Sequence, residues 1–207
     1  MPLNPETIEH LRTEIDPLAK NIESYVDIPQ QTDFLVRYAS MAKHGLIEIG
    51  AWKGRSTVYL ADTAKRRGLP FVVVDSWMDC DIPEYFGINV FPEFKRNLMT
   101  FGLFDRLTIL RKRSEKAVEE FKRSILPNKN FDFLFIDGDH KYQSVKQDFE
   151  LWAPLLERPA IIVFHDVLWD TVGRFLSEVK PLGQWEEMGN IGALVLEDNI
   201  NHQKRKT

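Results

Sequence analysis

Two kinds of hydrophobic spacing alternate along most of the chain. Apolar side chains three and four positions apart over residues 5–25 and 30–43 predict two helices near the amino end. Short, nearly continuous apolar runs predict buried strands at residues 45–49, 70–75, 107–111, 131–137 and 160–166. Helical spacing returns after each of these runs, at residues 56–67, 93–101, 115–124, 142–156 and 171–179.

Strands and helices in alternation predict a parallel sheet with helices on both faces. The carboxyl-terminal part breaks this order, because WEEMGNIGALVLED has two strand-like runs around a turn at Gly189, Asn190 and Gly192. We therefore expect a doubly wound α/β fold whose mostly parallel sheet ends in an antiparallel hairpin. We also expect a single domain over residues 1–207, in which the helices of residues 1–43 cover the site and residues 201–207 form a frayed basic tail.

Composition narrows the class of protein. The net charge of -4 over 207 residues gives no basic surface for nucleic acid, so we expect no nucleic-acid partner. No apolar run approaches the ~20 residues of a membrane span, and the first residues lack the charged start and apolar core of a secretion signal. The single cysteine, Cys80, cannot form an intramolecular disulfide. These features predict a cytoplasmic protein without a membrane partner.

Residues 47–56, IEIGAWKGRS, place a carboxylate, two glycines and a hydroxyl where the first predicted strand turns into a helix. Gly50 and Gly54 allow the backbone to come close to a ligand, and Ser56 adds a hydroxyl beside the exposed N–H groups of a helix start. Asp75 ends the next strand, near the spacing at which an acidic residue binds ribose hydroxyls in nucleotide-binding sheets. The motif favours a ribose-bearing ligand; the alternative is a turn that serves only the chain reversal.

Acidic residues also follow the fourth and fifth predicted strands, as Asp137 and Asp139 in FIDGD and Asp166 in VFHD. Because the carboxyl ends of parallel strands meet at one edge of a sheet, we expect these carboxylates to gather there with Glu48 and Asp75. Such a rim suits ammonium and hydroxyl groups or a divalent cation better than a bare phosphate. The alternative is a set of strand-end turns without a ligand.

EIGAWKGRS, VVVDSW and FIDGDHKY, in this order and spacing, resemble the class I S-adenosylmethionine-dependent methyltransferases. The resemblance covers most of the chain, from residue 30 to the hairpin. The first motif is similar to that of the catechol and caffeoyl-CoA O-methyltransferases, and FIDGDHKY resembles the small-molecule methyltransferases of sugar and antibiotic tailoring. The resemblance implies a Rossmann-like fold, S-adenosyl-L-methionine as cofactor and O-methylation of a small-molecule hydroxyl.

Carried over residue by residue, the resemblance implies a cofactor site at the ends of these strands. Glu48 and Gly50 would border the methionine moiety, and Ser56 would meet its carboxylate. Asp75 would hold the ribose hydroxyls, and Ser114 would lie beside the adenine. The full set of expected cofactor-binding residues is Glu48, Gly50, Trp52, Gly54, Ser56, Asp75, Ser114 and Asp137.

The resemblance also implies how the acceptor loses its proton. In the catechol-type enzymes a divalent cation is bound by an Asp after the fourth strand and an Asp-Asn pair after the fifth, which correspond to Asp137 and Asp166. Val167 stands where the Asn would be, so the sequence leaves open whether Mg²⁺ or another divalent cation binds. His140 stands where these enzymes carry a basic residue near the acceptor oxygen, so we expect it to act as the catalytic base. His165 is the weaker candidate base.

Three other interpretations belong to different classes of protein. A nicotinamide-dependent oxidoreductase would share the sheet and Asp75, but GAWKG lacks the GxGxxG spacing and Glu48 would repel a pyrophosphate. Asp137, Gly138 and Asp139 resemble the DxD of metal-dependent glycosyltransferases, which have no evident need for the first motif. The last alternative is a catalytically degenerate methyltransferase fold that binds the cofactor or a protein partner without turnover.

Residues 78–92 form a long predicted loop rich in Asp, Pro, Gly and aromatic residues. Trp77, Tyr85, Phe86 and Phe91 would suit an aromatic or amphipathic acceptor if they faced the pocket, and they would equally well dock the loop onto the core. The sequence does not identify the small-molecule acceptor. It also leaves the oligomeric state open, with a homodimer as one alternative.

Overall fold

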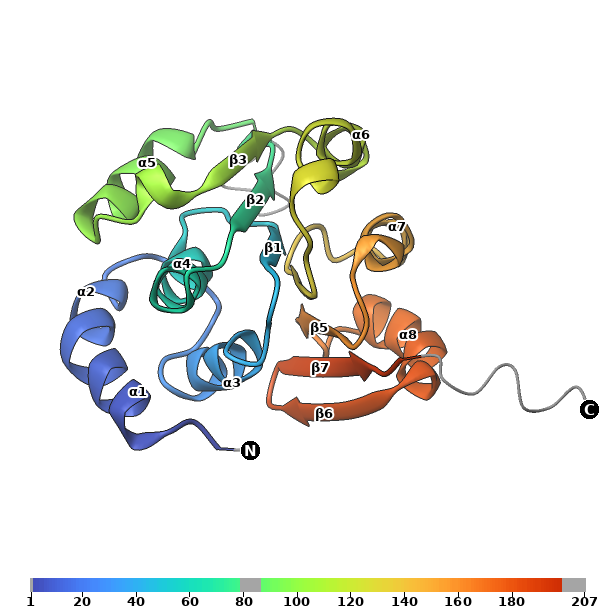
Figure 1. Cartoon of the computed structure of the whole chain (residues 1–207), viewed down its shortest axis with the longest axis horizontal. Coiled ribbons are helices and arrows are strands. Elements are labelled where there is room, and N and C mark those ends of the chain that lie inside the picture. The colour runs from blue at the N-terminus through green and yellow to red at the C-terminus, as the bar shows by residue number, and fades with distance from the viewer. Residues whose placement is uncertain (1, 79–86, 199–207) are drawn as a thin grey trace, which may run out of the picture.

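A computed structural model describes residues 2–78 and 87–198 of the chain. Within these residues the centre of the fold is a seven-stranded sheet in the order β3-β2-β1-β4-β5-β7-β6 (Figure 1). Strands β1 to β5 pair in parallel, whereas β7 lies antiparallel to both β5 and β6. The strands are β1 (Leu46–Ile49), β2 (Phe71–Asp75), β3 (Thr108–Arg111), β4 (Phe133–Ile136), β5 (Ala160–His165), β6 (Gln184–Met188) and β7 (Ile191–Leu196).

Helices connect the parallel strands and precede the sheet. They are α1 (Pro5–His10), α2 (Asp16–Ala19), α3 (Gln30–Ala39), α4 (Arg55–Arg67), α5 (Phe91–Thr100), α6 (Ser114–Ser124), α7 (Tyr142–Trp152) and α8 (Asp170–Val179). A π-helical turn at Leu11–Ile15 joins α1 to α2. Short 3₁₀ turns lie at Phe104–Arg106, Leu126–Asn128, Ala153–Leu155 and Lys180–Leu182.

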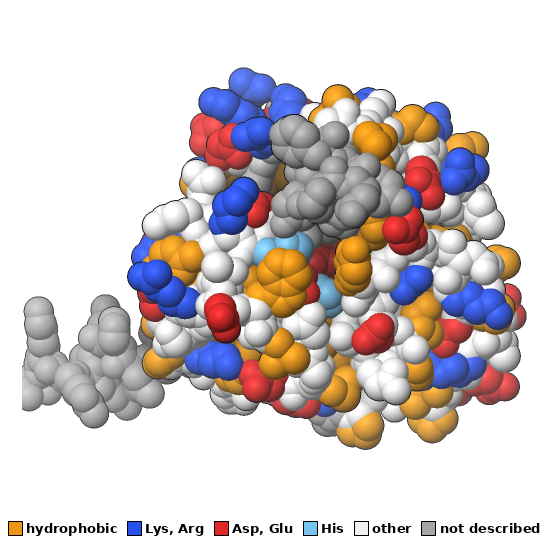
Figure 2. All heavy atoms as spheres, turned by 180° about the vertical axis from the view of Figure 1, so that it is seen from behind, with side chains coloured by type: hydrophobic (Ala, Val, Ile, Leu, Met, Phe, Trp, Pro, Cys, Tyr) orange, Lys and Arg blue, Asp and Glu red, His pale blue; other side chains and the backbone are white. Residues whose placement is uncertain are grey.

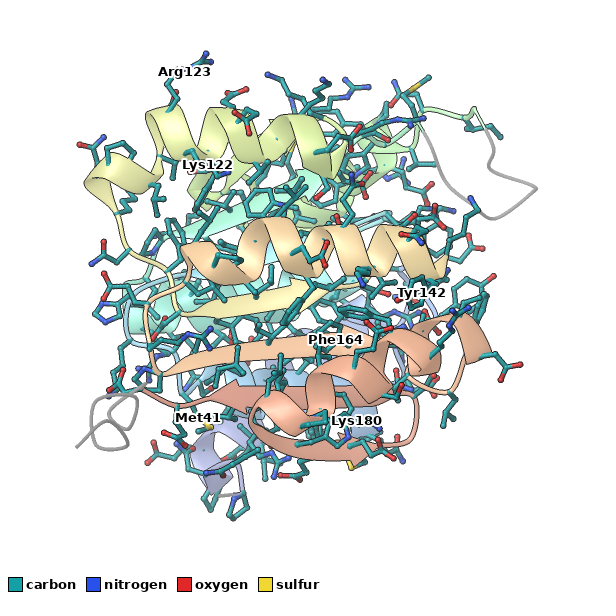
Figure 3. The ribbon with its side chains drawn as sticks, turned by 90° about the vertical axis from the view of Figure 1, so that its right-hand side faces the viewer. Met41, Lys122, Arg123, Tyr142, Phe164 and Lys180 are labelled. Carbon is teal, nitrogen blue, oxygen red and sulfur yellow. The ribbon has the colours of Figure 1, made fainter. Side chains whose placement is uncertain are left out.

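The alternation of side chains along each strand divides the core into two layers. On β1, Leu46 lies in a core layer with residues of α2 to α5 on one face, and Ile47 lies in a layer with residues of α6, α7 and α8 on the other (Figure 1). Phe164 of β5 lies in the second layer, where its ring contacts Phe149 of α7 and Phe175 of α8 (Figure 3). Since both faces are buried, the strands can be almost continuously apolar, which is the pattern that predicted them.

The predicted fold is confirmed: a mostly parallel Rossmann-like sheet, helices on both faces and an antiparallel hairpin at the end. The boundaries differ in places. The first predicted helix ends at Ala19, well before residue 25, and α5 begins at Phe91, inside the predicted loop. Cys80, Tyr85, Phe86 and the predicted basic tail lie outside the described residues. In the described part, no helix has the length and apolar character that crossing a membrane requires.

The sequence pattern predicts Gly192 in the hairpin turn, and this prediction is wrong. Gly192 lies inside β7, where it pairs with Phe164 and Glu187. A Cβ at this residue would lie 2.3 Å from the indole ring of Trp185. The glycine therefore makes room for a cross-strand indole, and the turn itself is formed by Gly189 and Asn190 alone.

Candidate active site

The carboxyl ends of β2, β1, β4 and β5 lie side by side and carry the predicted site residues. The loop after β1 meets the end of β4, where the Asp137 N–H donates to the Ile49 carbonyl at 2.8 Å. Gly50 approaches the same strand end so closely that a Cβ on it would lie 2.1 Å from the Asp137 carbonyl oxygen. This loop and the segment after β4 therefore form one continuous rim.

The loop from residue 50 to residue 54 turns through left-handed backbone conformations. Gly50 has φ +85°, Trp52 +43° and Gly54 +90°. A glycine adopts such values freely, while Trp52 does so at a cost that its surroundings must offset. The Trp52 ring stacks on Tyr25, with ring centroids 6.0 Å apart and an interplanar angle of 10°. The amino-terminal segment thus supports the loop from outside.

Asp75, at the end of β2, binds this loop through its carboxylate. Oδ2 accepts from the Ala51 and Trp52 N–H groups, both at 2.8 Å, and Oδ1 accepts from the Trp77 N–H at 2.6 Å. These three N–H groups occupy most of the roughly four acceptor positions of a carboxylate, so Asp75 fixes the shape of the loop. Trp77 itself is 2% exposed and packs against Phe91 and Phe94. This packing agrees with the alternative in which these aromatic residues dock the loop onto the core.

Glu48 points from β1 toward α4 and is fully buried. The Ser56 hydroxyl donates to its Oε1 at 2.6 Å, whereas Oε2 has no hydrogen-bond partner among the described residues. Burial raises the pKa of Glu48 to about 8, and the hydroxyl groups of Ser56 and Thr57 offset only part of that effect. Near neutral pH the side chain is therefore largely protonated.

Ser114 begins α6 and lies between two helices. Its hydroxyl accepts from the Trp152 Nε1 at 2.8 Å and hydrogen-bonds the carboxyl of Asp148. Burial raises the pKa of Asp148 to about 6. The Asp148 Oδ2 lies 3.4 Å from the position that a Cβ of Gly138 would occupy, so this polar group borders the segment after β4.

The centre of the rim is an ion cluster around His165, the last residue of β5. Its Nδ1 lies 2.9 Å from Asp166 Oδ2 and 3.2 Å from Asp137 Oδ1. Its Nε2 lies 2.8 Å from Oε1 of Gln31, which comes from α3. Burial alone would lower the pKa of His165, but the two carboxylates outweigh it and raise the pKa to about 10. The cluster therefore contains a buried imidazolium.

His140 approaches the same carboxylate from the solvent side. Its Nε2 lies 2.6 Å from Asp166 Oδ2, its side chain is 21% exposed, and its ring lies 4.5 Å from that of Trp169. Burial would raise the pKa of Asp166, but the hydrogen bonds from His140 and His165 hold it well below its usual range. On one face of the molecule, Figure 2 shows histidine and acidic side chains in a hollow between hydrophobic side chains.

Asp166 has φ +55°, an uncommon conformation for a residue with a side chain. Asn190, in the hairpin turn, donates from Nδ2 to Asp166 Oδ1 at 2.6 Å and accepts from the Leu168 N–H at 3.1 Å. Val167 packs into the apolar layer with α8. An amide does reach Asp166, but it comes from the hairpin and not from position 167, where the catechol-type enzymes that the sequence resembles carry an Asn.

Sequence reasoning placed Asp137, His140 and Asp166 at one rim, and these residues form the one group in the described part of the chain that could hold a metal ion. Asp139 stays outside this group, because its carboxylate accepts from the Lys141 N–H and the Ser144 hydroxyl at the start of α7. The sequence pattern favours His165 only as the weaker candidate base, and it does not indicate the roles of Gln31 and Asn190. Strand alternation puts His165 on the α3 face of the sheet with Ile161 and Val163, so its burial there could have been predicted. Gln31 and Asn190 have no comparable pattern in the sequence around them.

A family model described as a methyltransferase domain matches residues 47–167, more than half of the chain. A relative, the "Uncharacterized protein y4gI" of Sinorhizobium fredii (strain NBRC 101917 / NGR234), is 31% identical over 132 residues. The aligned part is 63% of this chain and only 13% of that relative, so the chain spans a small part of the relative's length.

Two solved structures share the fold along almost the whole chain. Cofactor-bound Rv0187 from MTB superposes with a TM-score of 0.65 and 21% identity, over 96% of this chain and 100% of that one. An O-methyltransferase from Bacillus cereus, in complex with SAH, superposes with a TM-score of 0.61 and 20% identity, over 94% and 92%. By its family match, this chain belongs to the methyltransferase domain family.

Proposed function

We propose that this chain transfers the methyl group of S-adenosyl-L-methionine to a hydroxyl oxygen of a small molecule. The observation that carries the proposal is the His140–Asp166 pair, which lies on the same rim as the loop of residues 50–54. Membership of the methyltransferase domain family supports methyl transfer. The fold shared with the Bacillus cereus O-methyltransferase, which was solved with SAH, supports the cofactor and an oxygen as the methylated atom.

The residues at the rim fit this cofactor. Gly50 and Gly54 let the loop turn tightly against the end of β4 and against α5. Glu48 carries a buried oxygen that would accept from an ammonium group once its carboxyl ionises, and the positive charge of that group would favour the ionised form. Asp75 ends β2 where the resemblance places the acceptor of the ribose hydroxyls, and a bound ribose would have to replace part of its contacts with the loop N–H groups. Ser56 would have to turn its hydroxyl proton away from Glu48 before it could bind the methionine carboxylate. Trp52, Ser114 and Asp137 complete the proposed cofactor site.

In the proposed reaction His140 removes the acceptor proton. With Nε2 directed at Asp166, the ring takes the proton on Nδ1, and the Asp166 carboxylate stabilises the imidazolium that forms. Asp137 and Asp166 orient the acceptor hydroxyl. When bound, S-adenosyl-L-methionine would supply an electrophilic methyl group, and its sulfur would keep the S–C bonding electrons and become a neutral thioether. The acceptor oxygen forms the new O–C bond with the electron pair that its O–H bond releases when His140 takes the proton.

A divalent cation is a second element of the proposal. The ligand atoms of Asp137, His140 and Asp166 lie within 4.8 Å of one another, and two carboxylates with an imidazole suit such an ion. Val167 supplies no ligand, so water would complete the shell and we expect weak binding. The ion would lower the pKa of the acceptor hydroxyl. His140 can act as ligand or as base, but not as both in one turnover.

The acceptor is proposed to be a small molecule that reaches the rim beside His140 and Trp169. A cytoplasmic location, a single domain and the absence of a nucleic-acid or membrane partner stay predictions from the sequence, as does the homodimer alternative.

Calorimetry with S-adenosylhomocysteine, NAD and a UDP-sugar in parallel tests the cofactor. We expect binding of S-adenosylhomocysteine alone. Methyl transfer from radiolabelled S-adenosylmethionine to a panel of catechols, hydroxybenzoates and nucleotide-linked sugars then tests the reaction. Binding of the cofactor without transfer to any hydroxyl compound would favour the degenerate alternative, and binding of NAD or UDP-sugar alone would end the proposal.

A further inference from the structure

Gln31, in the first turn of α3, lies before the segment that the family model matches, yet it reaches the ion cluster around His165, 134 positions along the chain. The side chain is 6% exposed, and its Oε1 accepts from the Asp27 N–H at 3.2 Å and contacts His165 Nε2 at 2.8 Å. Its Nε2 lies 3.5 Å from Asp27 Oδ2. Both Asp27 contacts require the same orientation of the amide, with the oxygen directed at His165.

This orientation fixes the hydrogens of the His165 ring. An amide oxygen can only accept, so Nε2 carries a hydrogen and donates it to Gln31. Ionised carboxylates can also only accept, so Nδ1 carries a hydrogen that Asp166 and Asp137 share, at 2.9 and 3.2 Å. The His165 ring is therefore held on both sides: Gln31 of α3 binds Nε2, and the carboxylates of Asp137 and Asp166 bind Nδ1.

We infer that Gln31 is a positioning residue of the methyl-transfer site: through His165 it holds Asp137 and Asp166 together at the rim. The inference rests on the proposed function for its catalytic meaning. It also assigns part of the site to the segment before residue 47, outside the portion that matches the family model. The inference applies to both proposed mechanisms, since each of them needs these carboxylates in place.

Packing alone does not account for a glutamine at this position. Further along α3, the side chains of Phe34, Leu35 and Val36 are buried and apolar. A buried amide costs free energy unless it is hydrogen-bonded, so an apolar residue would serve simple packing better. Two carboxylates around a ring whose side chain is 1% exposed repel each other unless a donor lies between them. Gln31 keeps that donor turned toward both.

Proton NMR of the full chain with ¹⁵N-labelled histidine tests the inference, with His165→Gln to identify the signals. We expect the parent to show a low-field Nδ1–H signal of His165 that exchanges slowly with water, and a second signal for Nε2–H. Gln31→Met removes the acceptor at nearly constant volume, so both signals should shift or broaden. Gln31→Glu keeps an acceptor and should retain the Nδ1–H signal. Gln30→Met, the same change at the exposed neighbour, should leave the spectrum unchanged.

A purely structural role for Gln31 would lower the melting temperature and leave the Nδ1–H signal in place, and that result would overturn the inference. If Gln31→Met does not fold, the parent spectrum decides, because a His165 ring with one unprotonated nitrogen contradicts the contacts directly. Turnover provides a separate readout: kcat of Gln31→Met should fall about tenfold, while KM for S-adenosylmethionine stays within about twofold. If the parent protein fails to bind S-adenosylhomocysteine, the proposed function is wrong, but the NMR result still decides whether Gln31 positions His165.

Discussion

Gly50 faces the backbone carbonyl of Asp137 at a distance that admits no side chain, since a Cβ would lie 2.1 Å from that oxygen. Its φ of +85° is also unfavourable for any residue with a Cβ. The relationship joins the loop after β1 to the end of β4, and it thereby brings the proposed cofactor site against the candidate catalytic cluster.

Gly50→Ala should lower the free energy of unfolding by about 3 kcal/mol, because backbone strain and overpacking act together. Gly102→Ala is the matched control, since Gly102 has φ +62° but open space around it. It should lose only ~1 kcal/mol. Urea unfolding of both variants measures the difference, and equal losses would mean that the contact with Asp137 has no energetic weight.

Asp75→Ala should weaken S-adenosylhomocysteine binding by on the order of 2 kcal/mol, because it removes the charge-assisted acceptor proposed for the ribose. It should also lower the melting temperature, since the N–H groups of Ala51, Trp52 and Trp77 lose their acceptor. Calorimetry and thermal unfolding separate the two effects. Asp105→Ala, at an exposed residue next to the start of β3, is the control and should change neither. Unchanged affinity in Asp75→Ala would remove Asp75 from the site.

The sequence allowed the fold to be predicted because both layers of the sheet are buried, so that each strand reads as an apolar run. The ends of the elements were less certain. Gly192 looked like a turn residue, since a glycine that makes room for Trp185 on the neighbouring strand cannot be told locally from one that reverses the chain.

The candidate site was predictable only where a residue follows a strand. Asp137 and Asp166 each stand next to a strand end, so topology brought them together. Gln31 and Asn190 reach the cluster from α3 and from the hairpin, through contacts that span 134 and 24 positions of sequence. No local pattern encodes such contacts. The same holds for Ser56, whose hydroxyl is engaged by Glu48 before any ligand arrives.

Glu48 predicts a dependence of stability on pH. The ordinary pKa of its carboxyl is 4.5, and burial raises it to about 8 in the folded protein. Between these values the folded state binds more protons than the unfolded state, so this residue lowers the free energy of unfolding as the pH rises. The full penalty, on the order of a few kcal/mol, is present above pH ~8.

Glu48→Gln removes this titration, so its stability relative to the parent should increase from pH 6 to pH 9. Urea unfolding at the two pH values measures the change. Glu6→Gln, at an exposed glutamate, should follow the parent at both. A Glu48→Gln variant whose difference from the parent does not vary with pH would show that Glu48 keeps an ordinary pKa.

The last prediction concerns how the acceptor loses its proton, and it separates the two uses of His140. If His140 is the base, methyl transfer to the acceptor found in the panel should survive a chelator. His140→Ala should then cost about 10²-fold or more in kcat. If a divalent cation activates the acceptor, chelation should abolish transfer, Mg²⁺ should restore it, and Asp166→Ala should be nearly inactive.

Asp137 cannot decide between these mechanisms, because both require its carboxylate. His44→Ala, at an exposed histidine near the amino end of β1, controls for general effects of losing an imidazole and should keep full activity. The His140–Asp166 distance of 2.6 Å means that a bound cation must displace this hydrogen bond, so Mg²⁺ should protect His140 from carbethoxylation only if the ion binds there. Full activity in chelator together with full activity of His140→Ala would leave neither mechanism standing, and the proton would then have to leave through a group outside this cluster.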